Sequence, residues 1–202
     1  MRKRIASIVA VVALAGAVLA VTAVLQIGSS DASAKGNGGG SGGGTPGIHV
    51  PSDPSTPLTP ADSDGLTFMR EEEKLARDVY VLLGDRYDVR IFDNIARSES
   101  KHMAAVKRLM DIYSVPDPVG DDVPGSFRDP TLSELYTALT AQGERSLAEA
   151  LRVGVTIEKM DISDLEDRIA ATDRADLKAV YGNLLRASNK HLRAFNRKLA
   201  RI

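Results

Sequence analysis

Apolar residues recur at helical spacing in four long segments of the chain, which predicts four amphipathic helices. The first has neither proline nor glycine, and Gly84 is placed to end it. Folded structure is therefore expected to begin near Asp64. The four segments run from about Leu66 to Leu83, Phe92 to Tyr113, Ser146 to Ala171 and Asp176 to Leu199.

Residues 114–129, between the second and third segments, are rich in proline and glycine and predict a long connection. Thr131 is expected to cap a short helix from Leu132 to Ala141, with Glu134 completing a capping box. Four long helices, one crossover carrying a short extra helix and no convincing strand pattern predict an all-α protein. The economical architecture is an antiparallel four-helix bundle.

The amino-terminal residues 1–34 have the pattern of a signal peptide. Three cationic residues precede an uncharged run from Ile5 to Leu25, and Ala32-Ser33-Ala34 fits a signal-peptidase site. We therefore expect an exported protein, secreted or associated with the cell envelope. The uncharged run is close to the ~20 residues that span a bilayer, so an uncleaved membrane anchor is the alternative.

Residues 35–63 are rich in glycine and serine and then in regularly spaced proline. This composition is too polar and too interrupted to bury a core, and it predicts a disordered tether. The expected organisation is a leader (1–34), a tether (35–63) and a folded domain (64–202).

Composition narrows the range of partners. The chain has 26 basic and 27 acidic residues and a net charge of −1, so no basic excess points to nucleic acid. It has no cysteine, which excludes thiolate ligands and disulfides, so any bound metal ion must use oxygen and nitrogen ligands. Contact with a membrane is expected only through an uncleaved leader, and a homodimer is compatible with the sequence.

Acids and histidines interrupt the apolar stripes of the predicted helices. Glu99 and His102 are three residues apart, so both side chains point to nearly the same side of a helix. Glu-x-x-His alone is a weak signal. However, His102, Glu158 and His191 each lie near the middle of a long helix, at similar depth if neighbouring helices are antiparallel. Because buried acids and histidines need partners, the pattern predicts a metal site inside the bundle.

Several of these positions have simpler interpretations. Glu73 shares the core stripe with Tyr80, but Glu72 is a close alternative because it aligns with Val79, whereas Glu71 is expected to be a solvated acid. Glu99 and His102 together would also suit a surface hydrogen-bonded pair, and His191 alone would suit a core histidine.

Three stretches carry a resemblance to a known family: Met69 to Tyr80 (MREEEKLARDVY), Phe92 to His102, and Ser188 to Phe195. The first resembles the first ligand helix of rubrerythrins and ferritins. Together they are similar to the uncharacterised, ferritin-like domain family DUF2202, over roughly Gly65 to Leu199. The resemblance implies a ferritin-like bundle with a metal centre, but this family has no established activity to carry over.

By that resemblance, five residues match the ligand positions of ferritins and rubrerythrins: Glu73, Glu99, His102, Glu158 and His191. Ser188 departs from the pattern, because it stands where the second Glu-x-x-His pair would have its glutamate. Asp161, one turn after Glu158, is the expected substitute. Without that substitute, the site would hold one ion or an asymmetric pair.

The resemblance implies one or two iron ions, with manganese or zinc as alternatives, and an oxidoreductase acting as a ferroxidase or reducing peroxide or dioxygen. Tyr80 and Tyr181 are expected beside the ligands, with Ser188. The alternative is a non-catalytic, exported metal-binding or scaffold bundle.

Overall fold

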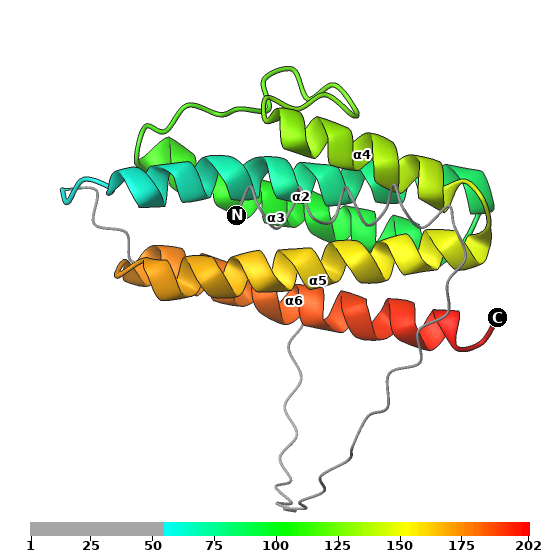
Figure 1. Ribbon diagram of the computed structural model, residues 1–202. Coiled ribbons are helices and arrows are strands. Elements are labelled where there is room, and N and C mark those ends of the chain that lie inside the picture. The colour runs from blue at the N-terminus through cyan, green and yellow to red at the C-terminus, as the bar shows by residue number, and fades with distance from the viewer. Residues whose placement is uncertain (1–54) are drawn as a thin grey trace, which may run out of the picture.

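The structure, a computed structural model, describes residues 55–202, which form five helices and no strand (Figure 1). The expectation of an all-α protein is thereby confirmed. The expected leader and most of the expected tether lie outside the described residues. The helices are α2 (Pro60–Tyr87), α3 (Arg90–Ile112), α4 (Pro130–Gly143), α5 (Leu147–Ala171) and α6 (Ala175–Leu199).

The helices pack as two pairs that face each other. A short connection joins α2 to α3, and another joins α5 to α6, so the members of each pair run side by side (Figure 1). Contacts between α2 and α5 and between α3 and α6 bring the pairs together, and α4 packs against α2 and α5. None of the helices within 55–202 is long and apolar enough to span a bilayer.

The helix α2 begins before Asp64 because its amino terminus is well capped. The Thr59 hydroxyl accepts a hydrogen bond from the backbone N–H of Asp62 (3.1 Å), and the Asp62 carboxylate accepts one from the N–H of Thr59 (3.3 Å). Pro60 occupies the first helical turn, where its missing N–H costs nothing. Thr56 lies just before this cap, and its carbonyl accepts a hydrogen bond from the Arg174 side chain (2.8 Å).

Gly84 does not end α2, contrary to expectation. The helix continues to Tyr87 and is capped by Asp88, whose left-handed backbone (φ 50°, ψ 45°) lets its N–H bond to the carbonyl of Gly84. Gly84 instead allows α3 to approach, since a Cβ there would lie 2.8 Å from Asp93 Oδ1. The glycine serves helix packing rather than termination.

Buried charged residues of α2 hold the connection before α4 in place through hydrogen bonds. Glu71, only 3% exposed, accepts hydrogen bonds from the backbone N–H groups of Arg128 and Asp129, so the expectation of a solvated acid is wrong. Lys74, fully buried, donates to the carbonyl of Val123 (2.7 Å). Asp129, not Thr131, caps α4.

The apolar core is divided into two clusters along the helices. On α3, Phe92 and Ile95 belong to the first cluster and Val106 to the second. On α6, Phe195 belongs to the first cluster and Leu184 to the second. The buried acids and histidines occupy the interval between the clusters. They are Glu72, Glu73, Glu99, His102, Glu158, Asp161, Asp164 and the partly buried His191, and the buried Ser188 lies beside them.

Candidate metal centre

The buried polar interval brings together side chains from four helices. Glu73 comes from α2, Glu99 and His102 from α3, Glu158 from α5 and His191 from α6. These are the five positions that the resemblance predicted as ligands. Their atoms form two groups that share Glu99, and within each group the candidate ligand atoms lie within 4.8 Å of one another.

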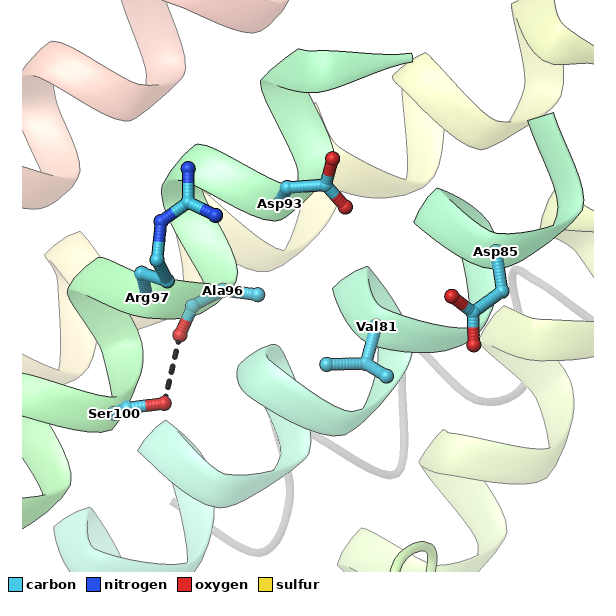
Figure 2. Close-up of a pocket in the computed structure, with 6 residues that line it drawn as sticks. All are labelled: Val81, Asp85, Asp93, Ala96, Arg97 and Ser100. Carbon is cyan, nitrogen blue, oxygen red and sulfur yellow. Dashed lines mark hydrogen bonds between the residues drawn. The ribbon is translucent and has the colours of Figure 1, made fainter. Parts of the chain in front are cut away.

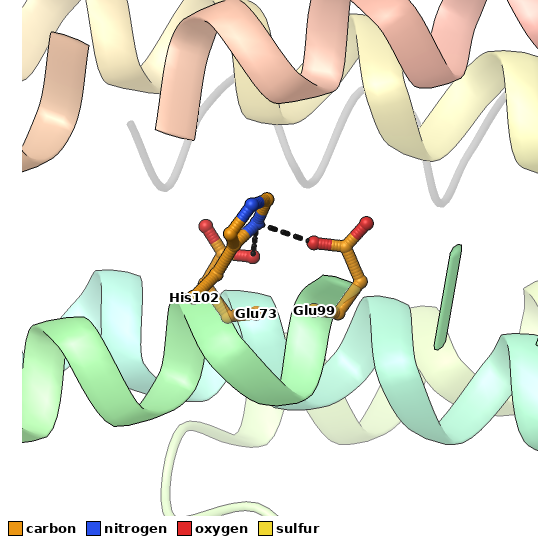
Figure 3. A group of neighbouring side chains, drawn as sticks. All are labelled: Glu73, Glu99 and His102. Carbon is orange, nitrogen blue, oxygen red and sulfur yellow. Dashed lines mark hydrogen bonds and ion pairs between the residues drawn. The ribbon is translucent and has the colours of Figure 1, made fainter. Parts of the chain in front are cut away.

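The first group consists of Glu73, Glu99 and His102 (Figure 3). His102 Nδ1 lies 2.6 Å from Glu99 Oε2 and 3.2 Å from Glu73 Oε2. Figure 3 shows the three side chains extending from α2 and α3 toward the opposite helix pair. The one-turn spacing of Glu99 and His102 therefore does place both groups on the inner face of α3, as predicted.

The second group consists of Glu99, Glu158 and His191. His191 Nδ1 lies 2.9 Å from the other oxygen of Glu99, Oε1, and 3.6 Å from Glu158 Oε2. Tyr80 donates a hydrogen bond from its hydroxyl to Glu158 Oε1 (2.8 Å), which holds that carboxylate in place. Glu99 thus faces one histidine with each of its oxygens.

The three carboxylates of the two ligand groups differ in pKa. Burial raises the pKa of Glu73 to about 8 and that of Glu158 to about 7, although a neighbouring histidine opposes the shift in each case. Burial also acts to raise the pKa of Glu99, but the hydrogen bonds from His102 and His191 outweigh it and lower the pKa to about 2. Glu99 is thus the carboxylate that stays charged between the two rings.

The residues present fit a bound cation. Four buried carboxylate and imidazole side chains, together with the partly buried His191, converge on one interval. Within residues 55–202, Glu73 Oε1 and Asp161 Oδ1 are buried without a hydrogen-bond partner. Such atoms are costly unless something neutralises and coordinates them. Mixed carboxylate and imidazole donors suit iron, manganese or zinc.

Asp161 and Ser188 lie beside the two groups rather than in them. The single proton of the Ser188 hydroxyl is within hydrogen-bond reach of Asp161 Oδ2 and of the carbonyl of Leu184. One oxygen of Asp161 is thereby hydrogen-bonded to Ser188. The sequence predicted that Asp161 would take the place of the missing glutamate as a ligand. Asp161 lies close by, but it belongs to neither ligand group.

Glu72 and Tyr181 differ from Glu73 and Tyr80 in their surroundings. Glu72 is fully buried but faces Asp164 and Asp161 instead of the histidines, so Glu73 is the residue placed for the centre. Tyr181 belongs to the apolar cluster of Leu66 and Leu184, and the charged groups that act on its pKa are Arg168, Asp62 and Asp176, none of them a candidate ligand. The expected role of Tyr181 beside the ligands does not fit this position.

Asp164 is a further buried acid, which the sequence patterns did not single out. It is only 5% exposed, so it lies between the helices and not on the surface. The available signal was its spacing, because Asp164 lies three residues after Asp161 and six after Glu158 on the same helix.

A separate hollow lies on the outer face of the α2–α3 pair (Figure 2). It encloses about 230 Å³ and contains none of the predicted ligands. Its walls are Val81, Asp85, Asp93, Ala96, Arg97 and Ser100. The candidate chemistry therefore belongs to the interior and not to this surface.

The fold and site define an all-helical protein with a buried carboxylate–histidine cluster. Residues 62–201 match the family described as "Uncharacterized protein domain (DUF2202)", and the chain belongs to that family. The match confirms the resemblance to this family noted from the sequence.

Two similar proteins are informative about the fold. The chain is 51% identical over 138 residues, 68% of its length and 75% of the relative's, to the uncharacterised protein MJ0754 of Methanocaldococcus jannaschii. The crystal structure of that hypothetical protein is similar with a TM-score of 0.72 at 49% identity, covering 74% of this chain and 86% of that one. A DUF305 fragment from Deinococcus radiodurans, 14% identical with a TM-score of 0.56, shares the fold alone. That likeness covers 73% of this chain and 100% of the fragment.

Proposed function

We propose that this chain is an exported, ferritin-like four-helix protein that binds one or two metal ions, iron foremost, and acts as a metal-dependent oxidoreductase. The observation that carries the proposal is the position of Glu99, whose two oxygens face two histidines from different helices. Each histidine has a second acid beside it, Glu73 for His102 and Glu158 for His191. A shared carboxylate with a histidine and an acid on either side suits a pair of ions.

The packing of the helices supports the ferritin-like assignment. The pairs α2–α3 and α5–α6 face each other, and the chain passes from one pair to the other through a long connection and the extra helix α4. In ferritin-like carboxylate proteins the ligands project inward from facing helices in the same way. Export is proposed from the pattern of residues 1–34, and amino-terminal sequencing of the protein recovered from cells would show whether the leader is cleaved.

The residues around the centre have distinct tasks under this proposal. Glu73, Glu99, His102, Glu158 and His191 would hold the metal, and bound ferrous iron would supply electrons to dioxygen or peroxide. Tyr80 orients Glu158 through its hydrogen bond, and Ser188 orients Asp161. The apolar clusters on either side limit access of water to the interval. Protons held by Glu73, Glu158 and the histidines leave when a cation binds.

A second candidate function is non-catalytic metal binding. It is favoured by Ser188, which leaves the centre one carboxylate short of the ferritin pattern. A centre with fewer acidic ligands also suits zinc or manganese, which would be held without turnover.

The test is to add ferrous iron to the purified full-length protein without oxygen, measure bound iron, and then admit air or peroxide. We expect bound iron and an absorbance change faster than that of free iron, both lost in His102→Ala. Lys101→Ala, an exposed neighbour on the same helix, is the matched control and should behave as wild type. Iron bound without faster oxidation would favour the second candidate. Equal iron in wild type and His102→Ala would remove both.

A further inference from the structure

The last helix carries a row of exposed cations. Residues 177–202 contain seven Lys and Arg residues and no acid, although acids outnumber basic residues in the chain as a whole. Five of these cations follow one another at intervals of three or four residues, which places them along one side of α6 and just past its end. All five are exposed, and within residues 55–202 none makes an ion pair. They are Arg186, Lys190, Arg193, Arg197 and Arg201.

A second row of exposed cations runs along α3. Its four members are spaced by seven, four and seven residues, so they too share one side of a helix. The exposed acids of α3 are engaged elsewhere: Asp93 lies against Gly84 of α2, and Asp111 is paired with Lys107 (2.7 Å). The members of the second row are Arg90, Arg97, Lys101 and Arg108.

The two rows lie on the same face of the bundle. The helices α3 and α6 are antiparallel, since the first turns of α3 and the last turns of α6 belong to the same apolar cluster. In each helix a lysine directly precedes an inward-pointing histidine, Lys101 before His102 and Lys190 before His191. One residue turns a helix by about 100°, so in two antiparallel helices both lysines turn from the stacked rings to the same outer side.

This side of the bundle is left open by the rest of the fold. The extra helix α4 packs against α2 and α5, and it makes no contact with α3 or α6 (Figure 1). The nine cations of the two rows therefore form one exposed basic face.

We infer that the basic face docks the domain on an anionic phospholipid membrane. A membrane presents many phosphates in one plane, so both rows of cations can be neutralised at the same time. A protein partner would also need apolar or aromatic anchors, but no large exposed apolar side chain lies on α3 or α6. Single-stranded nucleic acid would need rings on which bases stack, and Phe92, Tyr181 and Phe195 are buried.

The basic face binds by charge and not by insertion. With no exposed apolar side chain on either helix, attraction acts only within the screening distance, about 10 Å at 0.1 M salt. Each cation near an anionic membrane strengthens binding about fivefold. The inference goes beyond the proposed function and stands without it, because none of the nine cations is a candidate metal ligand.

The experiment compares the binding of full-length protein to vesicles of phosphatidylcholine with phosphatidylglycerol and to vesicles of phosphatidylcholine alone. The chain has no cysteine, so a fluorophore can be attached to Ala179→Cys, seven residues before Arg186 on α6, or to Ala141→Cys on α4. Both positions are exposed. Quenching by lipids that carry a quencher on the headgroup shows which side of the domain meets the membrane, whatever residues 1–34 do.

We expect quenching of the label at position 179 and not of the label at position 141. The quenching should require phosphatidylglycerol and be lost when salt is raised to about 0.5 M, because the charges are then screened. Equal quenching at both positions, or quenching at neither, would overturn the inference.

Two triple variants of equal charge test the residues. Lys190→Gln, Arg193→Gln and Arg197→Gln together should weaken binding to the anionic vesicles about 100-fold. The matched control replaces three exposed cations outside the basic face, and it should stay within about threefold of wild type. Its changes are Arg86→Gln, Arg145→Gln and Lys159→Gln.

An equal loss of binding in both triple variants would show that net charge matters and the basic face does not, which overturns the inference. Nucleic acid is tested with a DNA duplex at the same salt concentration. Tighter binding to the duplex than to the anionic vesicles, lost in the first triple variant, would assign the basic face to nucleic acid and also overturn the inference.

Discussion

The imidazole rings of His102 and His191 lie face to face, with centroids 5.8 Å apart and planes inclined by 25°, although they come from α3 and α6. Two protonated rings at this distance repel each other. The neighbouring acids nevertheless raise the pKa of both histidines, against the opposing effect of burial, and that of His191 reaches about 9. The negative charge of Glu99 between them is what makes this arrangement stable.

Replacing Glu99 should therefore disturb both ligand groups at once. Because Glu99 is shared, Glu99→Gln is expected to weaken metal binding by at least about 10–100-fold, the range found when even an indirect metal contact is removed. Metal content per chain after equilibrium dialysis checks this. Glu134→Gln, an exposed acid on α4, should leave it unchanged. Full metal content in Glu99→Gln would contradict the shared role.

The two buried tyrosines should behave differently. Tyr80→Phe removes the hydrogen bond to Glu158, so metal affinity should fall by about 10–100-fold while the number of ions stays the same. Tyr181→Phe, in the other apolar cluster, should not change metal affinity. Isothermal titration calorimetry of both variants measures the difference. Equal affinities would show that Tyr80 does not position the carboxylate.

Gly154 and Gly182 provide a matched pair for the packing of α5 on α6. A Cβ at Gly154 would lie 2.6 Å from the Phe195 ring, so Gly154→Ala should lower the free energy of unfolding by about 1–3 kcal/mol. At Gly182 the nearest atom would be Arg186 NH1, 3.7 Å away, so Gly182→Ala should be neutral or stabilising by up to about 1 kcal/mol. Urea unfolding compares them. A neutral Gly154→Ala would mean that Phe195 can move aside.

The ion pair between Arg70 and Asp117 gives a dependence on pH. Burial acts to raise the pKa of Asp117, but hydrogen bonds from Arg70 (3.1 Å) and the N–H of Val119 outweigh it and lower the pKa. The folded protein therefore binds this proton less readily than the unfolded chain. The stabilisation is present above the ordinary pKa of 3.8 and is lost as pH falls through the lowered value.

Asp117→Asn should reduce the free energy of unfolding at pH 7 by about 1 kcal/mol or less, since the pair is partly exposed, and the difference should disappear at an acid pH below the lowered pKa. Urea titrations at both pH values measure it. Asp121→Asn, an exposed acid in the same connection, is the control. An unchanged difference at low pH would point to packing instead of charge.

The sequence predicted the long helices well because their apolar stripes continue for many turns. Their ends were less predictable, since Gly84 is explained by the approach of Asp93 and not by the local sequence. Likewise, Asp129 and Thr131 are both good caps, and only the path of the connection selects Asp129.

The candidate ligands could be named from the Glu-x-x-His spacing and from the family resemblance. The surrounding acids could not be assigned to the surface or the interior, because a solvated acid and a buried acid with partners can occupy the same sequence spacing on a helix. Glu71 is such a case, since its partners are backbone N–H groups 57 and 58 residues away in the chain. Tyr80 and Tyr181 were equally attractive on periodicity, but they lie in different apolar clusters.

The hydrogen bond from Arg174 to the carbonyl of Thr56 has a mechanical consequence. Arg174 precedes α6, whereas Thr56 precedes the cap of α2, so tension applied along the backbone at Thr56 would be shared between α2 and α6. Under such a load, α2 would not separate from the other helices until this hydrogen bond had broken.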